Sequence, residues 1–96
     1  MNSSLGKWPA HKQGLLNEKE YENNPDLFGI EEAISEGWKL KFDYQEPDGK
    51  SYEGLDVQPN KITKLNNKIL IHGYCDQWEK EWYFRLTDII HFKYCP

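Results

Sequence analysis

The sequence predicts a mainly β fold: a five-stranded, partly open small β-barrel with one short α-helix N-terminal to it. Three observations support this prediction. Apolar and polar residues alternate over several short segments, turn signals separate these segments, and aromatic residues make up 15% of the 96 residues. A chain of this length buries only one core, and large rings help because each buries a large area.

The chain is expected to divide into an acidic N-terminal segment at 1–25, flexible or irregular, and a barrel domain at 26–96. The formal net charge is -4, and residues 1–36 carry seven acids against three lysines. The segment is polar and shows no sustained apolar period, which is typical of a tail or an irregular strap. Trp8, Leu15 and Leu16 could pin part of it to the barrel.

A helix is expected to open at Asp26, because aspartate is a good N-cap and the acids that follow suit the positive end of a helix. Gly37 is a natural C-terminal stop. About three turns are too few for a stable isolated helix, so its apolar stripe must pack on the strands. That stripe consists of Leu27, Ile30, Ala33 and Ile34.

Five strands are expected after Gly37. The first alternates clearly, with one face formed by Trp38, Leu40, Phe42 and Tyr44. The others are expected at about 51–57 with a continuation at 62–65 after Pro59, then at 68–75, 81–85 and 89–94. The sequences at 47–49, 66–67 and 76–80 are expected turns, and 86–88 is long enough for one helical turn.

Four segments in this order resemble the WYL domain, a small Sm-like β-barrel found in bacterial transcription regulators and defence-associated proteins. The segments are Leu40–Tyr44 after a short helix, Val57-Gln58-Pro59, Ile69–Tyr74 and Phe84–Ile89. The match covers Ile34 to Phe92. The resemblance implies an Sm-like barrel in a regulatory, ligand-sensing module, with Tyr44 and Tyr74 at motif positions.

The chain departs from the WYL pattern mainly at basic positions, through which that family is thought to sense nucleic acid or nucleotides. Only Arg85 is retained among them, and the family's other arginines are replaced by Leu55, Trp78, Trp82 and Asp88. The naming Trp-Tyr-Leu tripeptide becomes Ile69-Leu70-Ile71, which keeps the strand apolar. The helix-turn-helix usual in the regulators is absent from the first third of the sequence.

Candidates for metal or catalytic chemistry are weak. Histidine and cysteine are the usual ligands of zinc, and the candidate ligands in this sequence are His72, Cys75, His91 and Cys95. On one strand His72 and Cys75 point to opposite faces, which disfavours both a zinc site and a Cys–His catalytic pair. Phosphate-loop, Gly-x-Ser-x-Gly and His-Glu-x-x-His motifs do not occur. We therefore expect no enzyme activity, no metal and no cofactor.

The sequence also bears on cellular location. No apolar run approaches the roughly 20 residues of a membrane helix, and the first residues lack the pattern of a signal peptide. Two cysteines cannot build a disulfide framework. We therefore expect a cytoplasmic protein with two free thiols and no membrane contact.

An aromatic cluster lies near the C-terminal end of the sequence. Trp82 and Phe84 are expected to share a face and to belong to the core, together with Ile90 and Phe92. Trp78 falls in a turn, where it serves either as an anchor for a partner or as a lid over one barrel end.

The function favoured by the sequence is a non-enzymatic ligand-sensing or regulatory binding module for a small anionic ligand or a protein partner. Its predicted binding residues are Tyr44, Tyr74, Trp78 and Arg85. An ion pair of Arg85 with Asp88 or Asp76 is an equally good expectation. The alternative is a small phage or defence-system inhibitor that blocks a basic partner through its acidic N-terminal segment. Single-stranded nucleic acid ranks third because the charge disfavours it.

Overall fold

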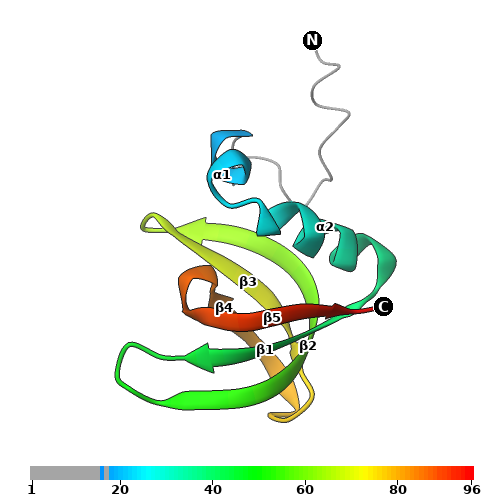
Figure 1. Cartoon of the computed structure of the whole chain (residues 1–96), viewed down its shortest axis with the longest axis vertical. Helices are drawn as coiled ribbons and strands as arrows, with labels where there is room; N and C mark the ends of the chain where they lie inside the picture. The colour runs from blue at the N-terminus through cyan, green and yellow to red at the C-terminus, as the bar shows by residue number, and fades with distance from the viewer. Residues whose placement is uncertain (1–15, 17) are drawn as a thin grey trace.

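The computed structural model describes Leu16 and residues 18–96. Along this part of the chain the elements are α1 (Glu18–Asn23), α2 (Asp26–Glu36), β1 (Lys39–Gln45), β2 (Ser51–Leu65), β3 (Lys68–Cys75), β4 (Lys80–Arg85), the 3-10 helix η3 (Leu86–Asp88) and β5 (Ile89–Cys95). The strands form one curved antiparallel sheet in the order β4-β3-β2-β1-β5, with both helices at one end (Figure 1). The predicted mainly β fold is confirmed, and the open sheet is consistent with a partly open barrel.

Strand β1 follows the predicted alternation. Leu40, Phe42 and Tyr44 are buried, and the residues between them are more exposed. Trp38 lies just before the strand and packs, half-buried, against the core. The register shifts around Asp43, whose Oδ1 accepts a hydrogen bond of 2.8 Å from the Gly54 amide. This bulge increases the curvature that brings the end of β1 toward the rest of the barrel.

Strand β2 is longer than predicted, because it runs without a break through Pro59. The register against β3 shifts between Pro59 and Lys61, so the ladder accommodates a residue that has no amide hydrogen. Pro59 lies opposite Gly73. A Cβ built on Gly73 would lie 2.5 Å from the Gln58 carbonyl oxygen, so the close approach of these two strands requires glycine.

Helix α2 begins and ends close to where the sequence predicts, but Asp26 is not its N-cap. Pro25 holds that position, and the first helical amides donate to the carbonyls of Asn24 and Pro25. No side chain caps this end, and Asp26 instead lies in the first turn, where the helix dipole favours an acid. Gly37 ends the helix as expected, with φ of 75° and its amide bonded to Ala33.

Helix α1 was not expected from the sequence. Tyr21 is fully buried and its hydroxyl donates to Glu31 of α2 at 2.6 Å. Glu20 pairs with Lys64 of β2 at 2.7 Å, and Leu16 packs against the core. The residues 18–23 are therefore held on the barrel rather than forming an irregular strap. Trp8 and Leu15 lie outside the described residues, and the boundary at residue 25 stays a prediction.

The core lies between α2 and the concave side of the sheet. Phe84 packs at right angles on Phe42 and Tyr44, with ring centroids 5.3 and 5.0 Å apart. Two of the expected core residues are exposed: Trp82 keeps 36% and Ile90 41% of its surface. Both lie on edge strands, which have a neighbouring strand on one side only, and on β4 Phe84 is the one buried residue. That geometry accounts for the wrong prediction.

Candidate binding site

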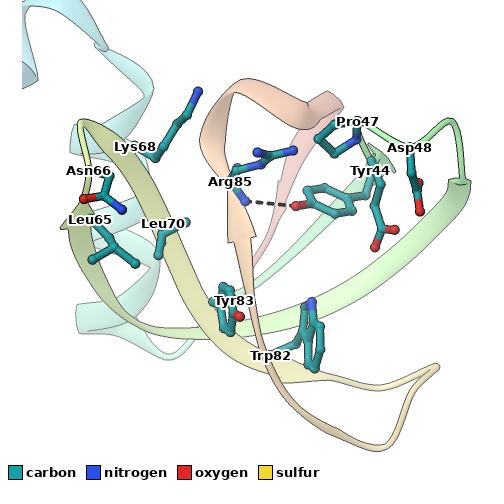
Figure 2. Close-up of a pocket in the computed structure, with 11 residues that line it drawn as sticks. Tyr44, Pro47, Asp48, Leu65, Asn66, Lys68, Leu70, Trp82, Tyr83 and Arg85 are labelled. Atoms are coloured by element: carbon teal, nitrogen blue, oxygen red, sulfur yellow. Dashed lines mark hydrogen bonds between the residues drawn. The ribbon is translucent and has the colours of Figure 1, made fainter.

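A concavity of about 560 Å³ opens beside strand β4. It is lined by the end of β1 with the turn after it at 44–48, by the β2–β3 turn with the start of β3 at 65–70, and by β4 at 82–85. Figure 2 shows Leu65, Lys68 and Leu70 on one side of Arg85, and Tyr44, Pro47 and Asp48 on the other. The walls are mainly apolar, and they carry four charged side chains: the acids Glu46 and Asp48 and the bases Lys68 and Arg85.

Tyr44 connects two parts of the barrel that do not pair as strands. Its ring is 5% exposed and packs on Phe84, and its hydroxyl accepts a hydrogen bond of 3.1 Å from the Arg85 backbone amide. Burial raises the pKa of the Tyr44 hydroxyl. The end of β1 is thereby fixed against β4, and the concavity has a rigid floor at this point.

Arg85 is the predicted site residue that the structure places most clearly. Its Nε donates to Asp88 Oδ2 at 2.8 Å, and its side chain is 30% exposed. This bond to Asp88 raises the pKa of the guanidinium above its already high value. The expected ion pair with Asp88 is therefore present, and it orients a guanidinium that still faces the concavity. Lys68 stands across from it, with no acidic partner among the residues that the structure describes.

Trp82 and Tyr83 form an exposed ring pair on β4. Their rings are nearly parallel, at 7°, with centroids 5.4 Å apart, although neighbouring residues of a strand normally point to opposite faces. Tyr83 is 51% exposed. Both rings line the concavity, whereas Phe84 of the same strand lies in the core.

Trp78 lies against the core rather than projecting as a free anchor. Its ring stacks on Phe84 at 5.5 Å and 30°, and it meets Tyr52 and Trp82 nearly at right angles. It lines a second concavity of about 350 Å³, which shares Glu46 and Trp82 with the first. The lid was one of the two roles that the sequence left open for Trp78, and the contacts with the core agree with that role.

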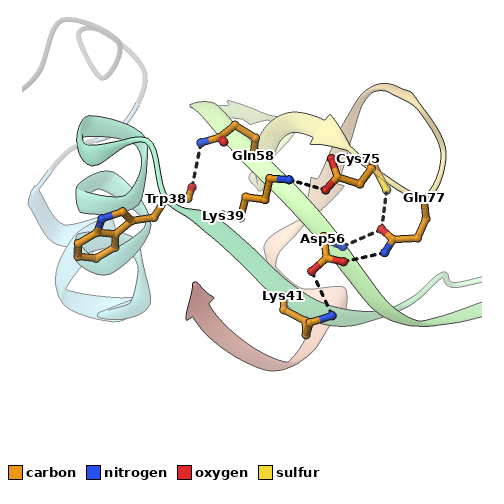
Figure 3. A network of polar contacts seen from close by, with 8 residues as sticks. Trp38, Lys39, Lys41, Asp56, Gln58, Cys75 and Gln77 are labelled. Atoms are coloured by element: carbon orange, nitrogen blue, oxygen red, sulfur yellow. Dashed lines mark hydrogen bonds and ion pairs between the residues drawn. The ribbon is translucent and has the colours of Figure 1, made fainter. Parts of the chain in front are cut away.

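A polar network fixes the turn that carries Trp78 (Figure 3). Gln77 exchanges two hydrogen bonds of 2.8 Å with Asp56, to whose carboxylate Lys41 is also paired at 3.1 Å. The hydrogen bond from the Gln77 side chain is the main reason why the pKa of Asp56 lies below its usual range. Lys39 pairs with Asp76 in the same turn. The network ties the β3–β4 turn to β1 and β2, which keeps the Trp78 ring in place.

The fourth predicted residue, Tyr74, lies apart from the others. It is 39% exposed on β3, opposite Gln58 and Glu81, and it lines neither concavity. The structure thus brings Tyr44 and Arg85 together and places Trp78 next to them. Glu46, in the turn after β1, and Lys68, at the start of β3, were not predicted as site residues, because their meeting depends on the strand order.

The histidines and cysteines are distributed over separate places. His72 bonds Thr63 at 2.7 Å, and burial lowers its pKa. His91 pairs with Asp43 at 2.7 Å on the opposite edge of the sheet. Cys75 is buried and Cys95 half-buried, and neither forms a disulfide. Within residue 16 and residues 18–96, no three potential metal ligands of the types His, Cys, Asp and Glu come together.

The comparison with solved structures identifies a protein that shares this fold. No protein-family model matches the chain, and no curated protein matches it. The structure is similar to that of proteasome accessory factor B/C of Arthrobacter aurescens, with a TM-score of 0.67 and 22% sequence identity. The similarity covers 85% of this chain but only 12% of the accessory factor. It shows that the two share a fold.

The helices that the structure describes are short. None of them, in residue 16 and residues 18–96, combines the length and the apolar character needed to cross a bilayer.

Proposed function

We propose that this chain is a non-enzymatic, WYL-like regulatory binding module, and that the concavity beside β4 is its ligand site. The fold shared with the accessory factor and the sequence resemblance to the WYL domain support the first part. The lining of the concavity supports the second part, because it combines exposed rings with a positioned guanidinium. Apolar walls with few polar groups are typical of small-molecule sites.

The observation that carries the proposal is the placement of Arg85. Its backbone amide is held by Tyr44, and its Nε by Asp88, so the side chain is oriented before a ligand arrives. A guanidinium has five N–H donors, and the bond to Asp88 uses the one on Nε. The donors that Asp88 and Tyr44 do not use would bind an anion, Lys68 would add positive charge, and the rings of Trp82 and Tyr83 would contact the apolar body of the ligand.

Benzoate is a suitable minimal probe, because it joins one ring to one carboxylate. We expect it to quench tryptophan fluorescence saturably, with a Kd of about a millimolar, as its small size implies. Benzyl alcohol has the ring without the charge and should bind much more weakly. Arg85→Gln should weaken benzoate binding about tenfold, since a charge-assisted hydrogen bond contributes about 1.5–3 kcal/mol.

Two further variants sharpen the test. Asp88→Asn should strengthen benzoate binding, because it removes a negative charge next to the guanidinium while keeping an oxygen that accepts from Nε. Lys93→Gln removes an exposed positive charge from β5 and should change nothing. Equal affinities for benzoate and benzyl alcohol, or equal affinities in wild type and Arg85→Gln, would refute the role of Arg85.

The alternative function, occlusion of a basic protein partner, gains one specific observation. The contacts of Tyr21 and Glu20 fix α1, so the exposed acids Glu18 and Glu22 keep a defined position beside α2. Deletion of residues 1–25 would remove a buried tyrosine and is therefore a poor test. Substitution of both Glu18 and Glu22 by lysine keeps the core intact. If this variant no longer inhibits the basic protein partner, occlusion is favoured.

A further inference from the structure

The second concavity has a composition different from the first. Its volume is about 350 Å³, and it is lined by three aromatic rings, one carboxylate and one ammonium: Tyr52, Trp78, Trp82, Glu46 and Lys80. Arg85 is not part of it. It shares Glu46 and Trp82 with the first concavity, but its charged groups are Glu46 and Lys80 and not the guanidinium.

The three rings meet nearly at right angles. The interplanar angle is 76° between Tyr52 and Trp78 and 86° between Trp78 and Trp82, with centroids 5.0 and 6.2 Å apart. Phe84 supports the Trp78 ring from the core. Rings fixed in different planes around one concavity present the partially negative faces of their π-systems in more than one direction, which is the arrangement that binds organic cations.

A cation already lies on one of these rings. The Lys80 ammonium is 4.5 Å from the centroid of the Trp82 ring, and no acid pairs with Lys80 in the part of the chain that the structure describes. The face of Trp82 therefore holds a positive charge without the help of a carboxylate. Lys80 is exposed, so an external cation can replace it at low cost.

The carboxylate of Glu46 adds the complementary charge. The Glu46 backbone amide donates to the Lys50 carbonyl at 2.7 Å, which fixes this residue in the β1–β2 turn. Its side chain has no hydrogen-bond or ion-pair partner among the described residues. An acid at the rim of an aromatic concavity favours a cation over a neutral apolar molecule of the same size.

We propose that this concavity is a binding site for quaternary or methylated ammonium groups. Methyl groups spread the positive charge over an apolar surface, which suits three rings, whereas a simple ammonium is strongly hydrated. Trp78 forms the part of the site supported by the core, Tyr52 and Trp82 complete the aromatic walls, and Glu46 supplies the charge. Lys80 acts as an internal competitor for the Trp82 face.

The test uses the full chain and tetramethylammonium as the probe, with tert-butanol as a neutral molecule of similar shape. The indole N–H signals of Trp78 and Trp82 are followed by NMR. Tetramethylammonium should shift both signals saturably, with a Kd in about the millimolar range, and tert-butanol should bind at least about tenfold more weakly. The Trp38 indole, at the junction of α2 and β1, should not shift.

Variants separate a cation site from a merely apolar hollow. Glu46→Gln should weaken tetramethylammonium binding about fivefold, Trp82→Leu should weaken it about tenfold, and Lys80→Gln should strengthen it. Trp78 is left unchanged because it packs on Phe84. Tyr74→Leu is the matched control, since it removes a ring of similar exposure that lines neither concavity, and it should leave the affinity unchanged.

The proposal fails if tert-butanol binds as tightly as tetramethylammonium, if no saturable shift occurs, or if Lys80→Gln weakens binding. It stands independently of the anion site, because Arg85→Gln should leave the tetramethylammonium affinity unchanged. Parallel loss of tetramethylammonium binding in Arg85→Gln and Glu46→Gln would also overturn it, because a site without Arg85 should not depend on that residue.

Discussion

Strands β1 and β4 use their aromatic residues in opposite ways. In β1, Phe42 and Tyr44 are buried, and every second side chain contributes to the core. In β4, Phe84 is buried, whereas Trp82 and Tyr83 remain exposed. β1 is paired on both sides, and β4 is paired only with β3. An edge strand can therefore carry rings that the fold does not need, and these rings are available for binding.

The largest expected difference between the two strands is in stability. Phe42→Ala should lower the free energy of unfolding by about 3–5 kcal/mol, because it leaves a cavity beside Phe84. Trp82→Ala should lower it by only about 1 kcal/mol, because the ring is partly exposed. Urea denaturation measures both effects. Equal losses in the two variants would show that β4 belongs to the core as much as β1 does.

A smaller effect concerns the attachment of α1. Tyr21→Phe should lower the free energy of unfolding by about 1–2 kcal/mol, because a buried hydrogen bond to Glu31 is lost. Tyr83→Phe, which changes an exposed hydroxyl on β4, serves as the control and should be neutral. A neutral Tyr21→Phe would mean that the hydrogen bond to Glu31 does not help to hold α1.

The same contact predicts an alkaline pH dependence. Burial, with a contribution from Glu31, holds the pKa of Tyr21 far above its usual value. The folded state therefore keeps a proton that the unfolded state releases at a pH above about 10, and stability must fall as the pH rises beyond that value. The free energy of unfolding, measured across this pH range, should fall less steeply in Tyr21→Phe than in the wild type. An identical pH dependence in the two proteins would contradict the assignment of this loss of stability to Tyr21.

The smallest expected effect lies at the β1 bulge. The Gly54 amide, and then His91, hold the pKa of Asp43 below its usual range. Stability contributed by this carboxylate is present above a pH of about 4 and is lost as the pH falls through the lowered value. Asp43→Asn should make acid unfolding slightly less steep, and Glu53→Gln, at an exposed position, should not. If the pH dependence of stability is the same in Asp43→Asn as in the wild type, ionised Asp43 does not contribute to acid stability.

The fold could be predicted in large part because its signals are local. Alternation in β1, the Asn66-Asn67 turn with both φ values positive, and Gly37 at the end of α2 each depend on a few neighbouring residues. Helix α1 could not be predicted this way. It has only six residues, and its stability comes from the contacts of Tyr21 and Glu20 with distant elements.

The candidate site could be predicted only in part. Tyr44 and Arg85 were identified from motif positions, and the hydrogen bond between them joins residues 41 positions apart. Lys68 and Leu65 reach the same concavity because Leu70 pairs with Arg85 across β3 and β4, a register that no local pattern indicates. The exposure of Trp82 depends on the open edge of the sheet, which alternation alone does not reveal.

An NMR map of benzoate binding can show whether the concavity beside β4 is the ligand site. We expect saturable shifts of backbone amides at 44–48, 65–70 and 82–85, and these shifts should disappear in Arg85→Gln. Shifts confined to α1 and α2, or a map unchanged by the Arg85 substitution, would contradict it.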